Sequence, residues 1–263
     1  MRVLTWNLWW RFGPWEQRQG AIAHVLGEEQ PDIVCLQEVW ADDERDQAQE
    51  LAAGLGCTAV RTEGVQMDGV SFGNAVLSRW PIVSSSQVAL PRADGSDGHR
   101  RALVAVLDTP WGAWPVISTH LDYRFDDSAV RERQAAALLE LVASVRGDPE
   151  RDPPVIIGGD FNAVPDSDEI RMLTGRRVSP VRNLVLSDAW EHVGEGAGHT
   201  WRHDNPYQSG TAWPNRRLDY VFVSWPRPRR TGHPLRVWRA GETAVDGVVA
   251  SDHSAVVADL ATP

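Results

Sequence analysis

Short apolar segments that stop abruptly at a polar residue recur along the whole chain, and this pattern restricts the fold more than any other feature. Such segments are bounded by Gly, Pro, Asp or Asn, are too short for typical helices and are characteristic of strands in a sheet. Strands are predicted at residues 2–6, 32–36, 57–62, 71–78, 82–90, 101–107, 114–120, 154–158, 217–224, 233–240 and 254–260.

Helical spacing of apolar residues is confined to a few segments between these strands. Residues 15–29, 42–55 and 127–145 are predicted helices, and 166–169 is expected to be a capped helix start. The arginine- and proline-rich stretch 226–230 is expected to be a loop between strands. No repeat or linker interrupts 1–263, so one domain is predicted, with two sheets packed face to face and helices on the outer faces.

Composition excludes several classes of protein. The 263 residues are 42% hydrophobic and 24% charged, as in globular proteins with a buried core. No apolar segment approaches the roughly 20 residues that span a bilayer. The first residues resemble a strand rather than a secretory leader, so a cytoplasmic location is expected. Cys35 and Cys57 do not make a disulfide framework, Cys35 is expected to be a buried thiol, and no obligate protein partner is evident.

The formal net charge of -10 disfavours a general electrostatic grip on long nucleic acid, which depends on basic side chains displacing counterions. A local basic groove remains compatible with this charge. The chain has no lysine, and all 26 basic residues are arginine. Any phosphate contact from a basic side chain is therefore made by a planar guanidinium, which can form two hydrogen bonds at once.

The polar residues that end the strands are those suited to metal and phosphate chemistry. Each has an ordinary explanation when taken alone, such as a solvated carboxylate, a structural histidine or a turn residue. Their joint occurrence after apolar segments predicts one cleft at a sheet edge. The residues are Asn7, Glu38, His120, Asp160, Asn162, Asp252 and His253, with Asp219 at the predicted strand 217–224.

Hydrolysis of a phosphate ester requires charge neutralisation, an oriented water and proton transfer at the leaving oxygen. Hard carboxylate oxygens suit Mg²⁺, so Glu38 is predicted as the first metal ligand and Asp252 as a second or outer ligand. Asn7 and Asn162 can donate amide hydrogens to phosphate oxygens without adding charge.

Proton chemistry needs a group whose pKa is set by its neighbours. A histidine beside a carboxylate has a fixed tautomer and a raised pKa, so His253 oriented by Asp219 is predicted to be a base or a phosphate-contacting cation. Asp160 is predicted to hold or deprotonate the attacking water.

Seven sequence blocks that contain these residues resemble, in order, the endonuclease/exonuclease/phosphatase family, which includes deoxyribonuclease I. The resemblance covers almost the whole chain and implies an α/β (α+β) four-layer sandwich of two mixed sheets with a Mg²⁺ or Mn²⁺ site. The blocks are Thr5-Trp6-Asn7, Leu36-Gln37-Glu38-Val39, 73–79, Ser118-Thr119-His120-Leu121, Gly158-Gly159-Asp160-Phe161-Asn162, 217–222 and Ser251-Asp252-His253-Ser254.

The resemblance implies the same metal ligands as the residue types do. Glu38 becomes the principal metal ligand, Asp252 lies near the metal, and Asn7 is an amide on the metal or phosphate side. Asp160 and Asn162 are implied to position the attacking water and the phosphate.

The resemblance also implies a carboxylate–histidine pair, Asp219 with His253, and a second histidine, His120, near the leaving oxygen. In deoxyribonuclease I, a carboxylate partners the histidine that matches His120. Here Asn74 lies near that place in the sequence, and it is expected on the substrate side of the site. Arg101 matches an arginine that often contacts phosphate, with Arg100 as the alternative.

These features predict a divalent-metal-dependent phosphodiesterase that acts on a phosphate ester of a small molecule or lipid head group. A DNA or RNA nuclease is the first alternative, and a non-catalytic binding scaffold of the same fold is the second. Two aromatic segments, 9–15 and 200–207, are expected at the rim of the cleft, where they could bind a base, a sugar or a head group, or simply pack.

Overall fold

A computed structural model describes residues 1–224 and 230–263, and its strands form two sheets that pack face to face. The order of the first sheet is β12 (Pro234–Ala240), β13 (Ala255–Leu260), β1 (Arg2–Asn7), β2 (Ile33–Ala41), β5 (Val70–Ser78) and β3 (Thr58–Arg61), with β4 (Val65–Met67) paired to β5. The order of the second is β10 (Leu186–Asp188), β11 (Asp219–Ser224), β9 (Ile156–Asp160), β8 (Gly112–His120), β7 (Asp97–Thr109) and β6 (Ile82–Pro91).

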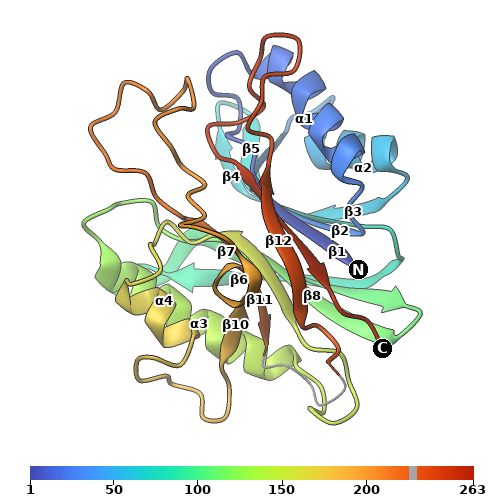
Figure 1. Ribbon diagram of the computed structural model, residues 1–263, viewed down its shortest axis with the longest axis vertical. Coiled ribbons are helices and arrows are strands. Elements are labelled where there is room, and N and C mark those ends of the chain that lie inside the picture. Colours follow the sequence, from blue (N-terminus) through green and yellow to red (C-terminus); the bar gives the residue numbers. More distant parts are fainter. Residues whose placement is uncertain (225–229) are drawn as a thin grey trace.

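Helices cover the outer face of each sheet (Figure 1). The first sheet carries α1 (Trp15–Glu29) and α2 (Gln47–Leu55), and the second carries α3 (Ser128–Val145) and α4 (Asp168–Leu173). A short helix, α5 (Ala189–Val193), lies beside β11 and β12. Because β1 pairs in parallel with β2, and β8 with β9, while the other pairs are antiparallel, both sheets are mixed. The predicted four-layer fold is confirmed.

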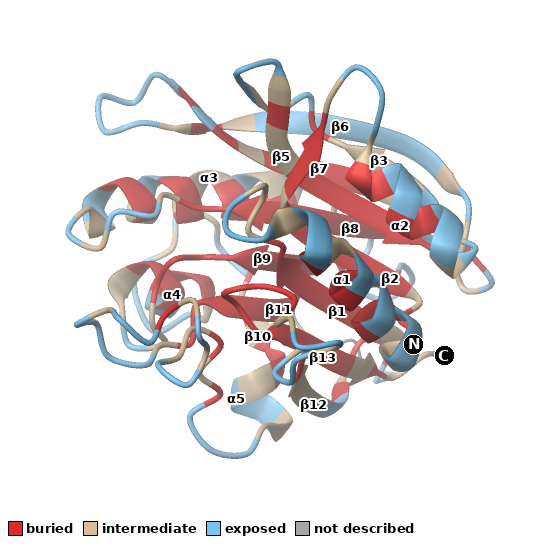
Figure 2. Cartoon of the chain, turned by 90° about the horizontal axis from the view of Figure 1, so that it is seen from above, coloured by how far each residue is buried: buried red, intermediate tan, exposed pale blue. Residues whose placement is uncertain are grey.

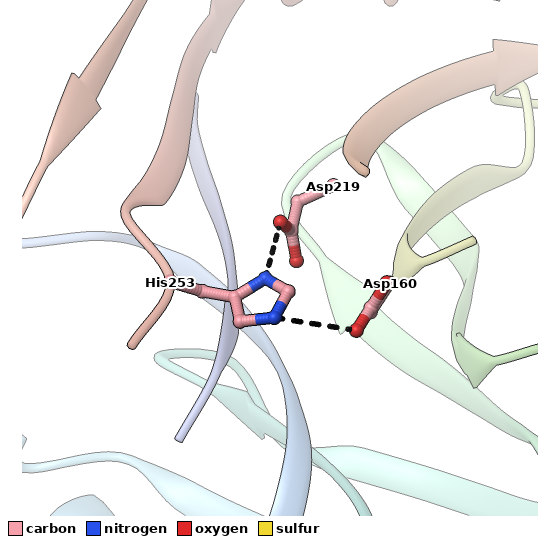
Figure 3. A group of neighbouring side chains, drawn as sticks. All are labelled: Asp160, Asp219 and His253. Carbon is pink, nitrogen blue, oxygen red and sulfur yellow. Dashed lines mark hydrogen bonds and ion pairs between the residues drawn. The ribbon is translucent and has the colours of Figure 1, made fainter. Parts of the chain in front are cut away.

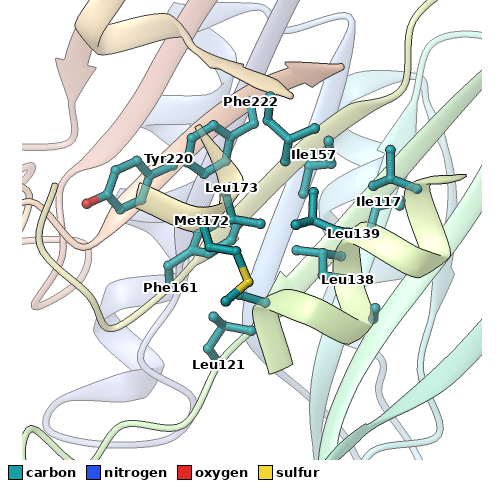
Figure 4. Close-up of a cluster of buried hydrophobic side chains, with 14 of the residues drawn as sticks. Ile117, Leu121, Leu138, Leu139, Ile157, Phe161, Met172, Leu173, Tyr220 and Phe222 are labelled. Atoms are coloured by element: carbon teal, nitrogen blue, oxygen red, sulfur yellow. The ribbon is translucent and has the colours of Figure 1, made fainter. Parts of the chain in front are cut away.

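Apolar burial holds the layers together, and each interface has its own cluster of buried side chains. Cys35 lies between the sheets among Val3, Val116 and Ile156, as predicted for a buried thiol. On the outer side of the second sheet, side chains of α3 and α4 pack against strand residues (Figure 4). Figure 2 shows that the strands are mostly buried and that α1 and α2 expose their outer surfaces.

The strand predicted at 32–36 continues to Ala41, and the helix predicted from Asp42 begins only at Gln47. Asp42 and Arg45 form a turn instead, with Asp42 N bonded to Arg45 O at 2.9 Å. The side chain of Asp46 then accepts a hydrogen bond from Gln49 N and caps α2. The acidic residues between 42 and 46 form a turn and then a helix cap. Helical periodicity of apolar residues does not distinguish these from the first turn of a helix.

Other differences concern short elements and strand ends. The strand predicted at 154–158 lies at Ile156–Asp160, so Asp160 is its last residue rather than part of a turn. The helix expected near 166–169 begins at Asp168, and its N-cap residue Ser167 makes no side-chain capping bond. The predictions did not include β4, β10 and α5, which are too short to show a clear period. The loop expected at 226–230 lies outside the described residues except for Arg230.

Two glycines precede Asp160, and the first of them, Gly158, lets the two sheets approach each other below the site. A Cβ atom on Gly158 would lie 2.6 Å from Cys35 Cβ and 3.1 Å from Thr5 Cβ, both on strands of the facing sheet. A Cβ on Gly159 would lie 2.5 Å from the carbonyl oxygen of Thr119. These positions therefore exclude a side chain for steric reasons, independently of any role of Asp160.

Replacing Gly158 with alanine should destabilise the fold by about 1–3 kcal/mol, because the added methyl group forces the facing strands apart. Urea unfolding of the purified protein measures this change. Gly20→Ala is the matched control, since a Cβ at Gly20 meets no atom within 4 Å and the residue lies inside α1. The free energy of unfolding of the Gly20→Ala control should rise by about 0.5–1 kcal/mol. A Gly158→Ala protein as stable as the wild type would contradict the steric interpretation.

Candidate active site

Strand register brings three of the predicted residues to one edge of the second sheet. The β8–β9 pairing places His120 beside Asp160, and the β11–β9 pairing places Asp219 on the other side of Asp160. In the first sheet β1 ends at Asn7, which is paired with Gln37 of β2, next to Glu38. The sequence prediction that these strand ends converge is therefore met by the structure.

Asn7 connects the two sheets at this edge. Its Nδ2 donates to Glu38 Oε1 at 3.2 Å and to Asp160 Oδ2 at 2.9 Å, while its Oδ1 accepts from Trp9 N at 2.9 Å. Asn7 is 2% exposed. One amide thus fixes the relative position of a carboxylate from each sheet.

Glu38 occupies a strained position that directs its side chain into the site. The register of β2 against β5 shifts between Leu36 and Val39, and Glu38 has φ 55° inside this bulge. Left-handed backbone in a residue other than glycine costs on the order of 1–3 kcal/mol and is concentrated at functional sites. Burial and the charge of Asp252 raise the pKa of Glu38 to about 7, against the opposing effects of Arg100 and Asn7.

The acidic groups on this side of the site fit a divalent cation. Glu38 Oε2 is buried and has no hydrogen-bond partner within the described chain, and Asp252 is close enough to raise the pKa of Glu38. The Asp252 carboxylate accepts a 2.9 Å bond from Gln208, and its pKa is raised mainly by burial. The unsatisfied Glu38 oxygen is a hard donor of the kind that Mg²⁺ and Mn²⁺ prefer, and the Asp252 carboxylate adds negative charge nearby.

His253 lies between two carboxylates (Figure 3). Its Nδ1 donates to Asp219 Oδ2 at 2.8 Å, and its Nε2 is 3.9 Å from Asp160 Oδ2. Thr200 Oγ1 also donates to Asp219 Oδ2, at 2.5 Å. Burial alone would lower the pKa of His253, but the charges of Asp219, Asp252 and Asp160 outweigh it and raise that pKa well above the usual value. These charges therefore favour the imidazolium form of His253.

Asp160, Asp219 and His253 also offer ligand atoms within 4.8 Å of one another, so this group could hold a metal ion. A histidine must be neutral to ligate a metal. The raised pKa of His253 and its bond to Asp219 oppose that use. Glu38 Oε2, which has no hydrogen-bond partner in the described residues, is a freer donor for a cation.

His120 is buried and neutral. Its Nε2 lies 3.1 Å from Asn162 Nδ2 and 3.4 Å from Asp160 Oδ2. Burial, followed by the charges of Arg100 and His253, lowers the pKa of His120 well below its usual value. Asn74 does not orient this ring, because its Nδ2 donates to Arg101 O at 2.7 Å, and His120 Nδ1 has no partner among the residues described.

Of the two candidate arginines, the structure favours Arg100. The guanidinium of Arg101 donates to the main-chain oxygens of Gly98 and Arg100. Arg100 is 8% exposed, and its Nε lacks a hydrogen-bond partner in the described part of the chain. Burial lowers the pKa of Arg100, and the carboxylates of Glu38 and Asp160 oppose this shift, so its guanidinium faces the site.

Arg18 is a structural residue of the site that the sequence prediction missed. It is fully buried, and it ties the segment after β1 to the segment before Asp252. Its position one turn before Ile22, on the buried face of the predicted helix 15–29, is the signal that could have revealed it. Its guanidinium donates to the carbonyl oxygens of Leu8, Trp9, Trp10, Phe12 and Ala250.

The two aromatic segments expected at the rim meet each other. The rings of Trp9 and Tyr207 have centroids 4.6 Å apart, and the Tyr207 hydroxyl donates to Val249 O at 3.1 Å. Trp15 packs on Trp40 away from this contact. Part of the aromatic character therefore stabilises the loops themselves.

The two mixed sheets, their four layers and the polar edge place the molecule in the deoxyribonuclease I-like class of α/β sandwiches. The sequence matches the Endonuclease/Exonuclease/phosphatase family over residues 4–253, and the chain belongs to that family. Members of this family are hydrolases that act on phosphate esters. In the residues described, no helix is long and apolar enough to cross a membrane.

Individual relatives differ in what their names describe. "Protein angel" of Drosophila melanogaster is 30% identical over 175 residues, which cover 63% of this chain and 48% of the relative. "Inositol phosphosphingolipids phospholipase C" of Schizosaccharomyces pombe is 27% identical over 260 residues, or 85% of this chain and 60% of the relative. A crystal structure of an endonuclease/exonuclease/phosphatase from Beutenbergia cavernae has a TM-score of 0.73 and 27% identity, and covers 99% of this chain and 71% of that one. The chain thus spans only part of these relatives.

Asp160 should make the stability of the metal-free protein depend on pH. Burial and the charge of Asp219 raise its pKa to about 6, against about 4 in an unfolded chain. The folded state therefore keeps a proton that the unfolded state has lost, and this stabilisation disappears as pH rises from about 4 to about 6. Asp160→Asn lacks this titration. The difference in free energy of unfolding between Asp160→Asn and the wild type should therefore shift by about 2–3 kcal/mol in favour of the variant between about pH 4 and about pH 6.

Urea unfolding of both proteins in EDTA, at several pH values from 4 to 8, measures this difference. Asp166→Asn, at an exposed aspartate outside the cluster, is the control and should follow the wild type. A constant difference between Asp160→Asn and the wild type over the whole range would contradict the raised pKa.

Proposed function

We propose that the chain is a divalent-metal-dependent phosphodiesterase in which water attacks phosphorus in line with the leaving oxygen. The observation that carries this proposal is the joint burial of Asp160, His253 and Asp219 beside the cation position at Glu38. A structural scaffold gains nothing from burying carboxylates at such cost, because buried charges destabilise the folded state unless they are compensated. Catalysis explains the arrangement better than the scaffold alternative.

Glu38 and Asp252 would hold Mg²⁺ or Mn²⁺, with Asn7 keeping the Glu38 carboxylate in place through its 3.2 Å bond. A bound divalent ion supplies positive charge for the phosphate oxygens and the departing alkoxide. The strained backbone of Glu38 is the local cost of presenting its carboxylate there.

Asp160 is the residue proposed to orient the attacking water and accept its proton. Its pKa of about 6 leaves it ionised at neutral pH and close to the optimum for a general base. The 2.9 Å bonds from Asn7 Nδ2 and Asn162 N fix the carboxylate. The Asn162 Nδ2 atom is already engaged by His120 Nε2 at 3.1 Å and Leu121 O at 3.3 Å, so the Asn162 side chain orients His120 rather than a phosphate oxygen.

Positively charged residues around Asp160 are proposed to stabilise the negative charge of the phosphoryl group. The His253 imidazolium, kept protonated by Asp219, is proposed to contact a non-bridging oxygen, and Arg100 faces the same region. His120 is neutral and lies near the proposed leaving oxygen, where it can donate a hydrogen bond. Asn74 and Arg101 then act indirectly, since Asn74 bonds to the main chain of Arg101 and orders the strand that carries Arg100.

The preferred substrate is a phosphodiester of a small molecule or a lipid head group, consistent with the net charge of -10. A relative named as a phospholipase C matches 85% of the chain and supports this choice. Nuclease activity is the alternative, and incubation with labelled DNA and RNA in Mg²⁺ distinguishes it. We place the activity in the cytoplasm, in agreement with the free thiols of Cys35 and Cys57.

Glu38→Gln should lower kcat for a generic aryl phosphodiester by about 10²- to 10³-fold in Mg²⁺. The reason is that charge stabilisation by a metal is worth several kcal/mol, and each 1.4 kcal/mol changes the rate about tenfold. Release of the aryl alcohol measures the rate, and thermal unfolding checks the fold. Glu44→Gln, at an exposed glutamate, should retain wild-type activity. Undiminished turnover by Glu38→Gln would refute the metal assignment.

Asp219→Asn should move the alkaline limb of the pH profile of kcat/KM to lower pH. Asp219 contributes to the raised pKa of His253, so its neutralisation makes the imidazolium lose its proton earlier. The acid limb, which is assigned to Asp160, should also move to lower pH, because the charge of Asp219 helps to raise the pKa of Asp160. Rates from pH 5 to 10 provide the measurement, and an unmoved alkaline limb would exclude His253 as the charged phosphate contact.

A further inference from the structure

A groove of about 580 Å³ opens beside the candidate active site, between the end of β6, the start of β7 and the segment after β8. Arg100 and His99 line this groove, and they also line a small cavity that reaches His120. The groove is therefore adjacent to the cavity that reaches the catalytic cluster, and His99 and Arg100 lie between the two. None of the roles proposed above uses the rest of this space.

The groove presents guanidinium groups that lack carboxylate partners. Arg92 and Arg124 are exposed along its walls, and neither forms an ion pair within residues 1–224 and 230–263. Arg100, the buried arginine at the junction, has an Nε without a hydrogen-bond partner in that same part of the chain. The pKa of His99 is lowered by burial and by the charge of Arg100, as expected where arginines dominate the local field.

Carboxylates also line the groove, but local bonds engage two of them. Asp94 accepts bonds from the nitrogen and hydroxyl of Ser96, at 3.0 and 2.6 Å. Asp122 accepts a 3.0 Å bond from the main-chain nitrogen of Arg124. Asp127 lies at the start of α3 and is the remaining acidic residue of the lining. Arg124 is attracted by Asp122 and Asp127 and bonds to Tyr123. Within the described residues, neither it nor Arg92 forms a direct ion pair with these acids, so both keep free donors.

The walls of the groove are held in place by a buried residue of α3. Gln134 is 2% exposed, accepts a 2.8 Å bond from Asp122 N and donates a 3.2 Å bond to Pro91 O. One amide thus connects the segment that carries Arg124 with the end of β6 next to Arg92. A groove with fixed walls does not need to be ordered when a ligand binds, which favours affinity.

We propose that this groove binds a second phosphate group of the substrate, next to the phosphodiester that is hydrolysed, with Arg92 and Arg124 as its ligands and Arg100 between the two phosphates. The inference rests on the proposed phosphodiesterase activity and narrows its substrate class. Guanidinium groups bind phosphate oxygens through charge-assisted, often bidentate hydrogen bonds. A nucleotide chain and a phosphorylated polyol head group both supply such a phosphate. Tyr123, 58% exposed on the lining, can contact the group that links them.

The test compares pairs of aryl phosphodiesters that differ only by one terminal phosphate, in Mg²⁺. One pair is built on a dinucleotide and the other on a polyol head group. The wild type should prefer the phosphorylated member of at least one pair in kcat/KM, by on the order of tenfold. The double variant Arg92→Ser/Arg124→Ser should lose most of this preference. Arg133→Ser, at an exposed arginine of α3 outside the groove, should keep it.

The outcomes separate this inference from the activity on which it rests. A preference confined to the dinucleotide pair supports the groove and identifies a nucleotide chain, and one confined to the polyol pair supports it and identifies a head group. Equal cleavage within both pairs, or a preference that survives in the double variant, overturns the groove proposal while phosphodiesterase activity stands. No cleavage of any diester by the wild type removes both proposals.

Discussion

The bridge made by Asn7 is the contact on which the rest of the site depends. Its amide donates to a carboxylate of each sheet, so two layers that are otherwise held together by apolar packing acquire a defined alignment at their polar edge. The close approach of the sheets below this edge requires glycine at 158. Side chains at the ends of strands from both sheets can then act on one phosphate, because packing fixes their backbones to within a fraction of an ångström.

The electrostatics of the site follow from burying several acids around one histidine. Burial raises the pKa of Glu38 and Asp160, and the same acids keep His253 protonated despite its own burial. Such an arrangement destabilises the isolated protein and becomes more favourable when positive charge enters. The strained backbone of Glu38 points in the same direction. The buried charges and the strained backbone lower the stability of the fold, and they hold charged groups in fixed positions, as is common in active sites.

The sequence predicted the fold class and most of the strands because alternating apolar segments and turn residues are local signals. It also identified the residues of the polar edge, since each follows an apolar strand. It did not resolve the choice between Arg100 and Arg101, because adjacent residues on a strand point to opposite faces and only the register decides which one enters the site. It also missed Arg18, whose five carbonyl acceptors are contributed mostly by loops.

What the sequence by itself determined is the set of acids, amides and histidines that suit a metal and a phosphate, because their identities and their order along the chain are local features. The tertiary structure alone decided how they interact. It gave His120 no Asn74 partner, set the charge state of His253 and opened an arginine-lined groove beside Arg100. The physical reason is that pKa values and hydrogen bonds depend on burial and on distances between segments far apart in the chain, which no local pattern encodes.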